Sequence, residues 1–157
     1  MSIRSLQRED QEPIENLLRA TDVFSEEEID VAIELIQIYL EDEHQKDYEI
    51  FSYVDSEQRV AGYVCIGPTP STQGTYDLYW IAVSPAVHGT GVGSELLQFV
   101  EGHLRAQGGR LLIAETSSTP KYEKTCMFYE RKGFERRACI KDYYKPGDDL
   151  IIYGKYL

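Results

Sequence analysis

Three glycines separated by single residues form the segment of this chain best suited to binding a ligand. The segment Gly89-Thr-Gly91-Val-Gly93 follows the apolar stretch Leu78–Val83 and precedes an amphipathic stretch that runs to about residue 106. Without side chains, the glycine backbone N–H groups can approach a ligand closely. A helix that starts here adds unpaired N–H groups and the positive end of its dipole. The segment therefore predicts a cradle for phosphate oxygens.

Two common phosphate-binding loops fit this segment poorly. A Walker loop requires a lysine before its Ser or Thr, and here Gly93 stands directly before Ser94. The dinucleotide-binding fingerprint is matched by Gly89 and Gly91, and Glu115 ends a strand about twenty residues downstream, where that fingerprint has its ribose-binding acid. Its third glycine, however, comes one position too early. A dinucleotide-binding redox module is therefore the weaker alternative.

Two separate segments resemble the GNAT superfamily of N-acetyltransferases. Val83-Ser-Pro-Ala-Val-His88-Gly-Thr-Gly91-Val-Gly93 resembles its acyl-coenzyme A signature, Gln/Arg-x-x-Gly-x-Gly/Ala after strand residues of the type L-x-V-x-P. Phe128-Tyr129-Glu-Arg-Lys-Gly133-Phe134 resembles the F-Y-x-x-x-G-F helix end of that family. The two motifs and the order of elements over essentially the whole chain favour this family. One departure is His88, which stands where the family usually has arginine or glutamine.

The resemblance implies transfer of an acetyl group from acetyl-CoA to an amine by direct attack in a ternary complex. The pyrophosphate would accept hydrogen bonds from the glycine-rich loop, and pantetheine would pair with the preceding strand like an added strand. A backbone N–H near Ala82 or Val83 would polarise the thioester carbonyl. The residues expected at acetyl-CoA are Ile81, Ala82, Val83, His88, Gly89, Thr90, Gly91, Val92, Gly93 and Ser94.

Tyr129 and two carboxylates are the candidate catalytic residues. The Tyr129 phenol could give a proton to the departing thiolate, because a phenol with a pKa of about 10 stays protonated at neutral pH. The acceptor ammonium must lose a proton before attack, to a carboxylate or a water chain. Asp77 stands where many family members carry a glutamate, and Glu115 ends the following strand, where α/β folds place their ligands. The choice between Asp77 and Glu115 stays open.

The elements that must position these residues alternate along the chain. Strands are expected at 3–6, 48–54, 60–66, 75–83, 110–115, 134–140 and 150–156, and helices at 10–20, 25–40, 91–106 and 121–132. Asp10 is a candidate cap of the first helix, and Ser25 with Glu28 forms a capping-box signature for the second. The residues from Tyr143 to Asp148 are expected to connect the last two strands. This pattern predicts one mixed α/β domain over residues 1–157. The resemblance adds a central, largely antiparallel sheet flanked by helices and splayed at the acetyl-CoA site.

Acidic residues are concentrated in one segment. The net charge is −11, and residues 9–49 hold 15 Asp and Glu against only Arg19 and Lys46, a balance of −13. Solvated helix faces explain such a segment, but it could also border a site for a cationic substrate. Nucleic-acid binding is disfavoured because it needs a basic patch. The acceptor is therefore expected to be a cationic small-molecule amine. The alternatives are a protein N-terminus or lysine, or a non-catalytic acyl-CoA-binding or sensor domain.

The remaining sequence features favour a cytoplasmic protein. No apolar run at the N-terminus forms a signal peptide, and no uncharged apolar stretch approaches about 18 residues, so no membrane span is expected. Cys65, Cys126 and Cys139 are scattered, which predicts reduced thiols and no metal site. Exposed strand edges near the C-terminus could support a homodimer.

Overall fold

The computed structural model describes all of residues 1–157, which group into two compact units. The first unit comprises Met1–Gly67 and Tyr79–His103, and the second comprises Pro68–Leu78 and Leu104–Leu157. The strands are β1 (Ser2–Ser5), β2 (Glu49–Val54), β3 (Val60–Pro68), β4 (Thr75–Val83), β5 (Leu111–Ser117), β6 (Glu135–Lys145) and β7 (Asp148–Tyr156). The α-helices are α1 (Gln11–Ala20), α2 (Glu26–Glu41), α3 (Val92–Ala106) and α4 (Glu123–Arg131). The glycine-rich loop thus lies in the first unit and Tyr129 in the second.

The seven strands form one sheet in the order β1-β2-β3-β4-β5-β7-β6. The pairs β1–β2, β2–β3, β5–β7 and β6–β7 are antiparallel, and β4–β5 is parallel. The parallel ladder runs from Thr75↔Leu111 to Leu78↔Ala114 and ends there, although β4 continues to Val83. The predicted fold class, a mixed and largely antiparallel sheet with flanking helices, is confirmed.

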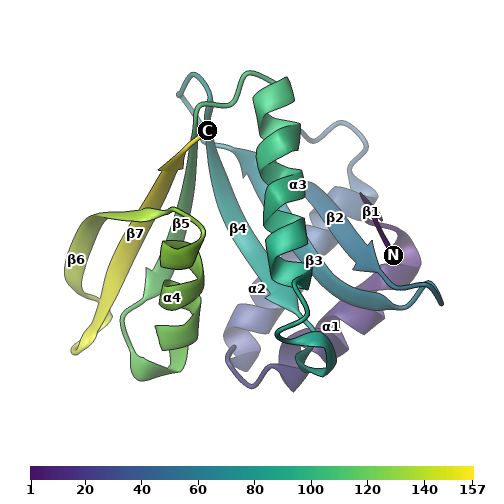
Figure 1. The fold of residues 1–157 in the computed structure, drawn as a ribbon, viewed down its shortest axis with the longest axis horizontal. Helices are drawn as coiled ribbons and strands as arrows, with labels where there is room; N and C mark the ends of the chain where they lie inside the picture. The colour runs from purple at the N-terminus through teal and green to yellow at the C-terminus, as the bar shows by residue number, and fades with distance from the viewer. The chain divides into compact units, whose positions relative to one another are not determined.

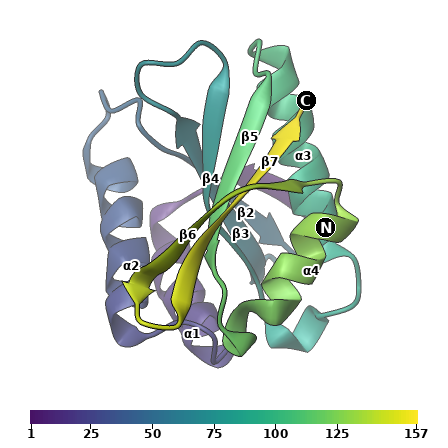
Figure 2. The same cartoon turned by 90° about the vertical axis from the view of Figure 1, so that its left-hand side faces the viewer.

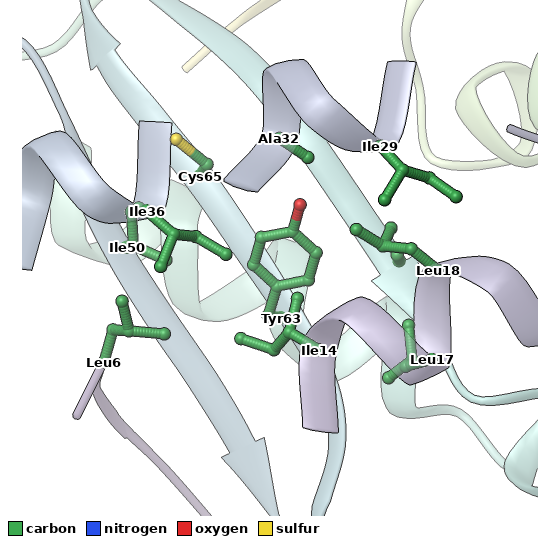
Figure 3. Packing of buried hydrophobic residues seen from close by; sticks show 11 residues of the cluster. Leu6, Ile14, Leu17, Leu18, Ile29, Ala32, Ile36, Ile50, Tyr63 and Cys65 are labelled. Carbon is green, nitrogen blue, oxygen red and sulfur yellow. The ribbon is translucent and has the colours of Figure 1, made fainter. Parts of the chain in front are cut away.

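Helices cover both faces of the strands in the first unit (Figure 1). The buried cluster on one face, part of which Figure 3 shows, joins α1 and α2 to β3 and β4 through Ile14, Leu18, Ile36, Tyr63, Cys65 and Ala82. On the other face, Phe51 of β2 packs against Phe99 of α3, with ring centroids 4.9 Å apart. Each buried Leu, Ile or Phe contributes about 1.5–3 kcal/mol of stabilisation. Packing on both faces therefore fixes the end of β4 that precedes the glycine-rich loop.

Of the two helix caps predicted from the sequence, one is confirmed and the other is wrong. The Ser25 capping box is confirmed, because the Glu28 N–H donates to Ser25 Oγ at 3.1 Å and the Ser25 N–H to Glu28 Oε1 at 3.1 Å. The prediction that Asp10 caps α1 is wrong, since its side chain accepts no hydrogen bond from the first turn of that helix. A short 3-10 turn at Arg8–Asp10 precedes the helix, and Asp10 itself has helical backbone angles. Its carboxylate is turned into the protein instead.

The Asp10 carboxylate is the centre of a buried polar network in the first unit. It accepts hydrogen bonds from Arg4 Nη1 at 2.7 Å, the Gln7 N–H at 2.9 Å and Ser52 Oγ at 2.9 Å. Arg4 lies on β1 and Ser52 on β2, so the network ties the start of α1 to the two strands beside it. Although burial alone would raise the pKa of Asp10, the Arg4, Gln7 and Ser52 hydrogen bonds together hold it below its usual value.

In the second unit, β7 pairs antiparallel with both β5 and β6, and α4 lies along these strands (Figure 2). β6 extends beyond the predicted strand and includes Tyr143 and Tyr144, so their assignment to a connection is wrong. The turn needs only Pro146 and Gly147, where glycine adopts a φ of +84°, and Lys145 pairs with Asp148 directly across it. β6 is the last strand in the sheet order, is exposed along its whole length and has two register shifts against β7.

Two further predictions concern the cysteines and the helices. All three cysteines are free thiols. None of the four α-helices combines the length and the apolar character that crossing a lipid bilayer requires.

Candidate functional site

The loop between β4 and α3 leaves open space at its glycines. Ser84 begins a short 3-10 turn at Pro85–Val87 by accepting a hydrogen bond from the Ala86 N–H. Gly89 and Gly91 follow with φ values of +78° and +94°, a conformation that L side chains rarely adopt. A Cβ added at either glycine would meet no protein atom within 4 Å. The conformation and the free space therefore suit a loop that a ligand approaches closely.

Some N–H groups of this loop are used within the protein. The His88 N–H donates to the Pro85 carbonyl and the Thr90 N–H to the Val87 carbonyl, each at 3.3 Å. The first turn of α3 presents N–H groups that have no partner inside the helix. These belong to Val92, Gly93 and Ser94. The donors suited to a phosphate group are therefore the start of α3 and the glycines before it.

The backbone groups at the end of β4 alternate between its two edges. The Ser84 N–H donates to the Ala61 carbonyl of β3 at 2.8 Å. Successive residues of a strand direct their N–H and C=O groups to opposite edges, so those of Val83 and Ile81 face away from β3. The Ala82 carbonyl faces β3, since a Cβ on Gly62 would lie 3.0 Å from it. Val83 and Ile81, rather than Ala82, can therefore offer backbone hydrogen bonds to a ligand.

The His88 side chain turns back toward β4. Its Nε2 lies 3.0 Å from the Val83 carbonyl oxygen. Because a carbonyl only accepts, Nε2 is the donor, which fixes the tautomer of a neutral ring. The ring therefore contacts the strand end and not only the loop to which it belongs.

Tyr129 is buried in the second unit at the inner side of α4. Its ring packs against Phe134 and Tyr153, with centroid distances of 5.2 and 5.6 Å. Burial raises the pKa of the Tyr129 hydroxyl well above its usual value, and the neighbouring Cys126 adds to the shift. The phenol is therefore protonated throughout the neutral range and can act as a proton donor, but not as a base.

Asp77 and Glu115 lie on the opposite face of the second unit's strands from Tyr129. Asp77 is in register with Ile113, two residues before Glu115, so the two carboxylates share one face. Tyr153, whose ring contacts Tyr129, pairs with the residue between Ile113 and Glu115, which faces the other way. The structure thus brings the two candidate bases to one side and the candidate acid to the other.

Thr69 contacts one of the candidate bases, and no sequence pattern singles it out. Its hydroxyl donates to Asp77 Oδ2 at 2.8 Å, which orients the carboxylate. The residue lies in a loop rich in Pro, Thr and Ser, and its backbone N–H donates to the Thr75 carbonyl. Only this pairing across the loop, which composition does not reveal, brings the Thr69 hydroxyl to Asp77. Glu115, by contrast, is exposed.

Aromatic side chains gather around the cluster between α1, α2 and the strands of the first unit. Phe24 and Trp80 make an edge contact at 5.1 Å, and Tyr48 and Tyr79 make another at 5.5 Å. Phe24, Tyr48 and Trp80 pack on the same buried cluster, and Tyr79 is 40% exposed. Burial raises the pKa of the Tyr48 hydroxyl, and the charges of Asp47 and Glu34 add to this. Aromatic rings and carboxylates therefore lie together just before Ile81 on β4.

A model of the Acetyltransferase (GNAT) family matches residues 9–134. A crystal structure from Desulfovibrio desulfuricans, described as an acetyltransferase of the GNAT family, is 43% identical, with a TM-score of 0.92 over 99% of this chain and 98% of that one. No protein of curated function matches the sequence.

More distant solved structures share the fold. An aminoglycoside 6'-N-acetyltransferase complexed with coenzyme A is 16% identical, with a TM-score of 0.77 over 99% of this chain and 97% of that one. The ribosomal-protein-S18-alanine N-acetyltransferase from Escherichia coli is 20% identical, with a TM-score of 0.75 over 99% of this chain and 92% of that one.

Proposed function

Because the chain belongs to the GNAT family of acetyltransferases, which use acetyl-CoA, we propose that it acetylates a primary amine of a cationic small molecule. The amine attacks the thioester directly in a ternary complex. The observation that carries this proposal is the glycine-rich loop, whose positive φ angles and open space lie directly before the start of α3. A non-catalytic binding domain is disfavoured by the family assignment and by the retention of Tyr129, Asp77 and Glu115.

The first unit supplies the groups that hold acetyl-CoA. The pyrophosphate accepts hydrogen bonds from Gly89, Gly91 and the first N–H groups of α3, where the helix dipole favours negative charge. The backbone of Ile81 and Val83 pairs with the pantetheine amides, because their polar groups face away from β3. An N–H from one of these two residues stabilises the tetrahedral oxyanion, and a preorganised donor of this kind contributes about 3 kcal/mol.

The second unit supplies the proton transfers. Asp77 or Glu115, directly or through water, takes the proton that the acceptor ammonium must lose. The amine nitrogen then forms a bond to the carbonyl carbon, the bond from carbon to sulfur breaks, and Tyr129 gives its proton to the departing thiolate. The nitrogen loses its second proton to water, and a proton from water restores the Tyr129 hydroxyl.

The first unit favours a cationic acceptor. Residues 9–49 carry a net charge of −13, and Arg19, one of their two basic residues, already forms ion pairs with Glu15 and Glu26. Most carboxylates of α1 and α2 are therefore left to solvent or to a ligand. The rings of Tyr79 and Trp80 stand two residues and one residue before Ile81, and ring faces attract ammonium groups. An amine with a second ammonium group suits both features.

A pair of matched amines tests the acceptor class. We expect 1,5-diaminopentane to have a kcat/KM at least about ten-fold above that of 5-amino-1-pentanol, because only the diamine keeps a second charge for the acidic segment. The preference should shrink as salt rises, since exposed charges are screened. Steady-state assays at low and high salt measure both effects. Equal kcat/KM values for the two amines, or a clear preference for a peptide with a free N-terminus, would contradict a cationic small-molecule acceptor.

The Gly91→Ala substitution tests the phosphate cradle. We expect it to weaken acetyl-CoA binding about ten-fold, because the new methyl group occupies the space proposed for the pyrophosphate and a φ of +94° strains alanine. Titration calorimetry measures the affinity. Gly108→Ala is the matched control, since Gly108 has a φ of +80° and an added Cβ there also meets no atom. If both variants bind acetyl-CoA alike, the cradle does not include Gly91.

A further inference from the structure

His88 makes a contact that the loop does not need for its own conformation. The turns around it are closed by other hydrogen bonds, from the Val87 N–H to the Ser84 carbonyl and from Thr90 Oγ1 to the Val87 carbonyl. Its backbone N–H also has a partner, the Pro85 carbonyl. The hydrogen bond from Nε2 to Val83 is therefore an additional link, made by an exposed side chain to the last residue of β4.

The Val83 carbonyl is the group that this link occupies. It faces away from β3, as the Ser84 hydrogen bond to Ala61 shows, and so lies on the edge proposed to pair with pantetheine. An added strand needs carbonyl acceptors along that edge, and Val83 offers the last one before the chain turns. Although a carbonyl oxygen has two lone pairs, a ring at 3.0 Å covers part of the direction from which a second donor must come.

We propose that His88 caps the Val83 carbonyl while no cosubstrate is bound, and that the ring leaves it when pantetheine pairs with β4. His88 is then a positioning residue that lowers the affinity gained from the pantetheine arm. This inference rests on the proposed function, because it assumes that pantetheine pairs with Ile81 and Val83.

Two ligands that differ only in the arm test this inference. Coenzyme A and adenosine 3'-phosphate 5'-diphosphate share the nucleotide and the pyrophosphate, but only coenzyme A carries pantetheine. For His88→Ala, we expect the ratio of their affinities to shift about five-fold toward coenzyme A, roughly the effect of one ordinary hydrogen bond. Loss of a contact between His88 and the pyrophosphate would change both affinities equally, so it would not change their ratio. An unchanged ratio, or a shift toward the nucleotide, overturns the proposal. His44→Ala, which removes another exposed histidine, should leave the ratio unchanged.

The ring nitrogens provide a readout that is independent of affinity. Under mildly alkaline conditions, the 15N shifts of His88 in the free protein should show a proton on Nε2, as the Val83 contact requires. Addition of coenzyme A should change these 15N shifts, because the ring leaves Val83. Addition of adenosine 3'-phosphate 5'-diphosphate, which lacks pantetheine, should leave the shifts unchanged. A proton on Nδ1 in the free protein overturns the inference. Failure of coenzyme A to bind at all contradicts the proposed function instead, and the free-protein spectrum still reports on the contact.

Discussion

Replacing Tyr129 by phenylalanine is expected to lower kcat about 100-fold and to leave the affinity for acetyl-CoA nearly unchanged, since a positioned general acid contributes about 10²–10⁴-fold. The substitution removes only the hydroxyl, and the ring contacts with Phe134 and Tyr153 persist. Because burial raises the pKa of this hydroxyl, the wild-type kcat should show no alkaline fall due to Tyr129 below about pH 10. Steady-state kinetics over pH, together with calorimetry, measure both quantities.

A second buried tyrosine serves as the control for this substitution. The Tyr63 hydroxyl is fully buried in the first unit and has no hydrogen-bond partner, so Tyr63→Phe removes the same group from a position without a proposed role. Its kcat should match that of the wild type. A Tyr129→Phe enzyme with normal kcat would reduce Tyr129 to a packing residue, and the proton for the thiolate would then have to come from another group.

Replacing Asp10 by asparagine is expected to lower the free energy of unfolding by about 3 kcal/mol, because removing one partner leaves the other charge poorly compensated. Asp10 has a side chain only 3% exposed and accepts hydrogen bonds from Arg4, Gln7 and Ser52, all of which the substitution weakens. For a chain of this size, the melting temperature should fall by about 6–12 °C. Calorimetry or denaturant titration measures the loss.

The effect of Asp10 should depend on pH in one direction. Its pKa is lower in the folded protein than in the unfolded chain, so its contribution is complete above the unfolded value of about 3.9. This contribution is lost as pH falls through the lower, folded value, and the variant and wild type should converge there. Asp55→Asn, which breaks an exposed pair with Arg59, should lower the free energy of unfolding far less than Asp10→Asn does. An equal loss in both variants would contradict the central role of Asp10.

The features that the sequence predicted well are those fixed by neighbouring residues. The Ser25 capping box, the glycines of the loop and most element boundaries depend on residues a few positions apart. The orientation of the Asp10 side chain depends on Ser52, which is 42 positions away in the sequence. The pairing of β1 with β2 brings Ser52 close to Asp10. A local capping rule could not anticipate that partner.

The candidate site shows the same division between local and distant information. The residue types of Tyr129, Asp77 and Glu115 are readable from motifs and strand ends, but their opposite faces follow from the registers of β5 with β4 and β7. The contact of His88 with Val83 depends on a side-chain rotation within the loop, whereas the sequence predicted only that His88 lies at acetyl-CoA. That the chain forms a single domain stays a prediction.

The edge strand β6 has a consequence for how copies of this chain can associate. A long strand with one unpaired edge invites further strands and thus aggregation, and proteins oppose this with charges and irregular pairing. β6 has both safeguards, since Arg136, Arg137 and Lys141 lie along it and its ladder is interrupted twice. Continuation of the sheet from one molecule into the next is therefore disfavoured.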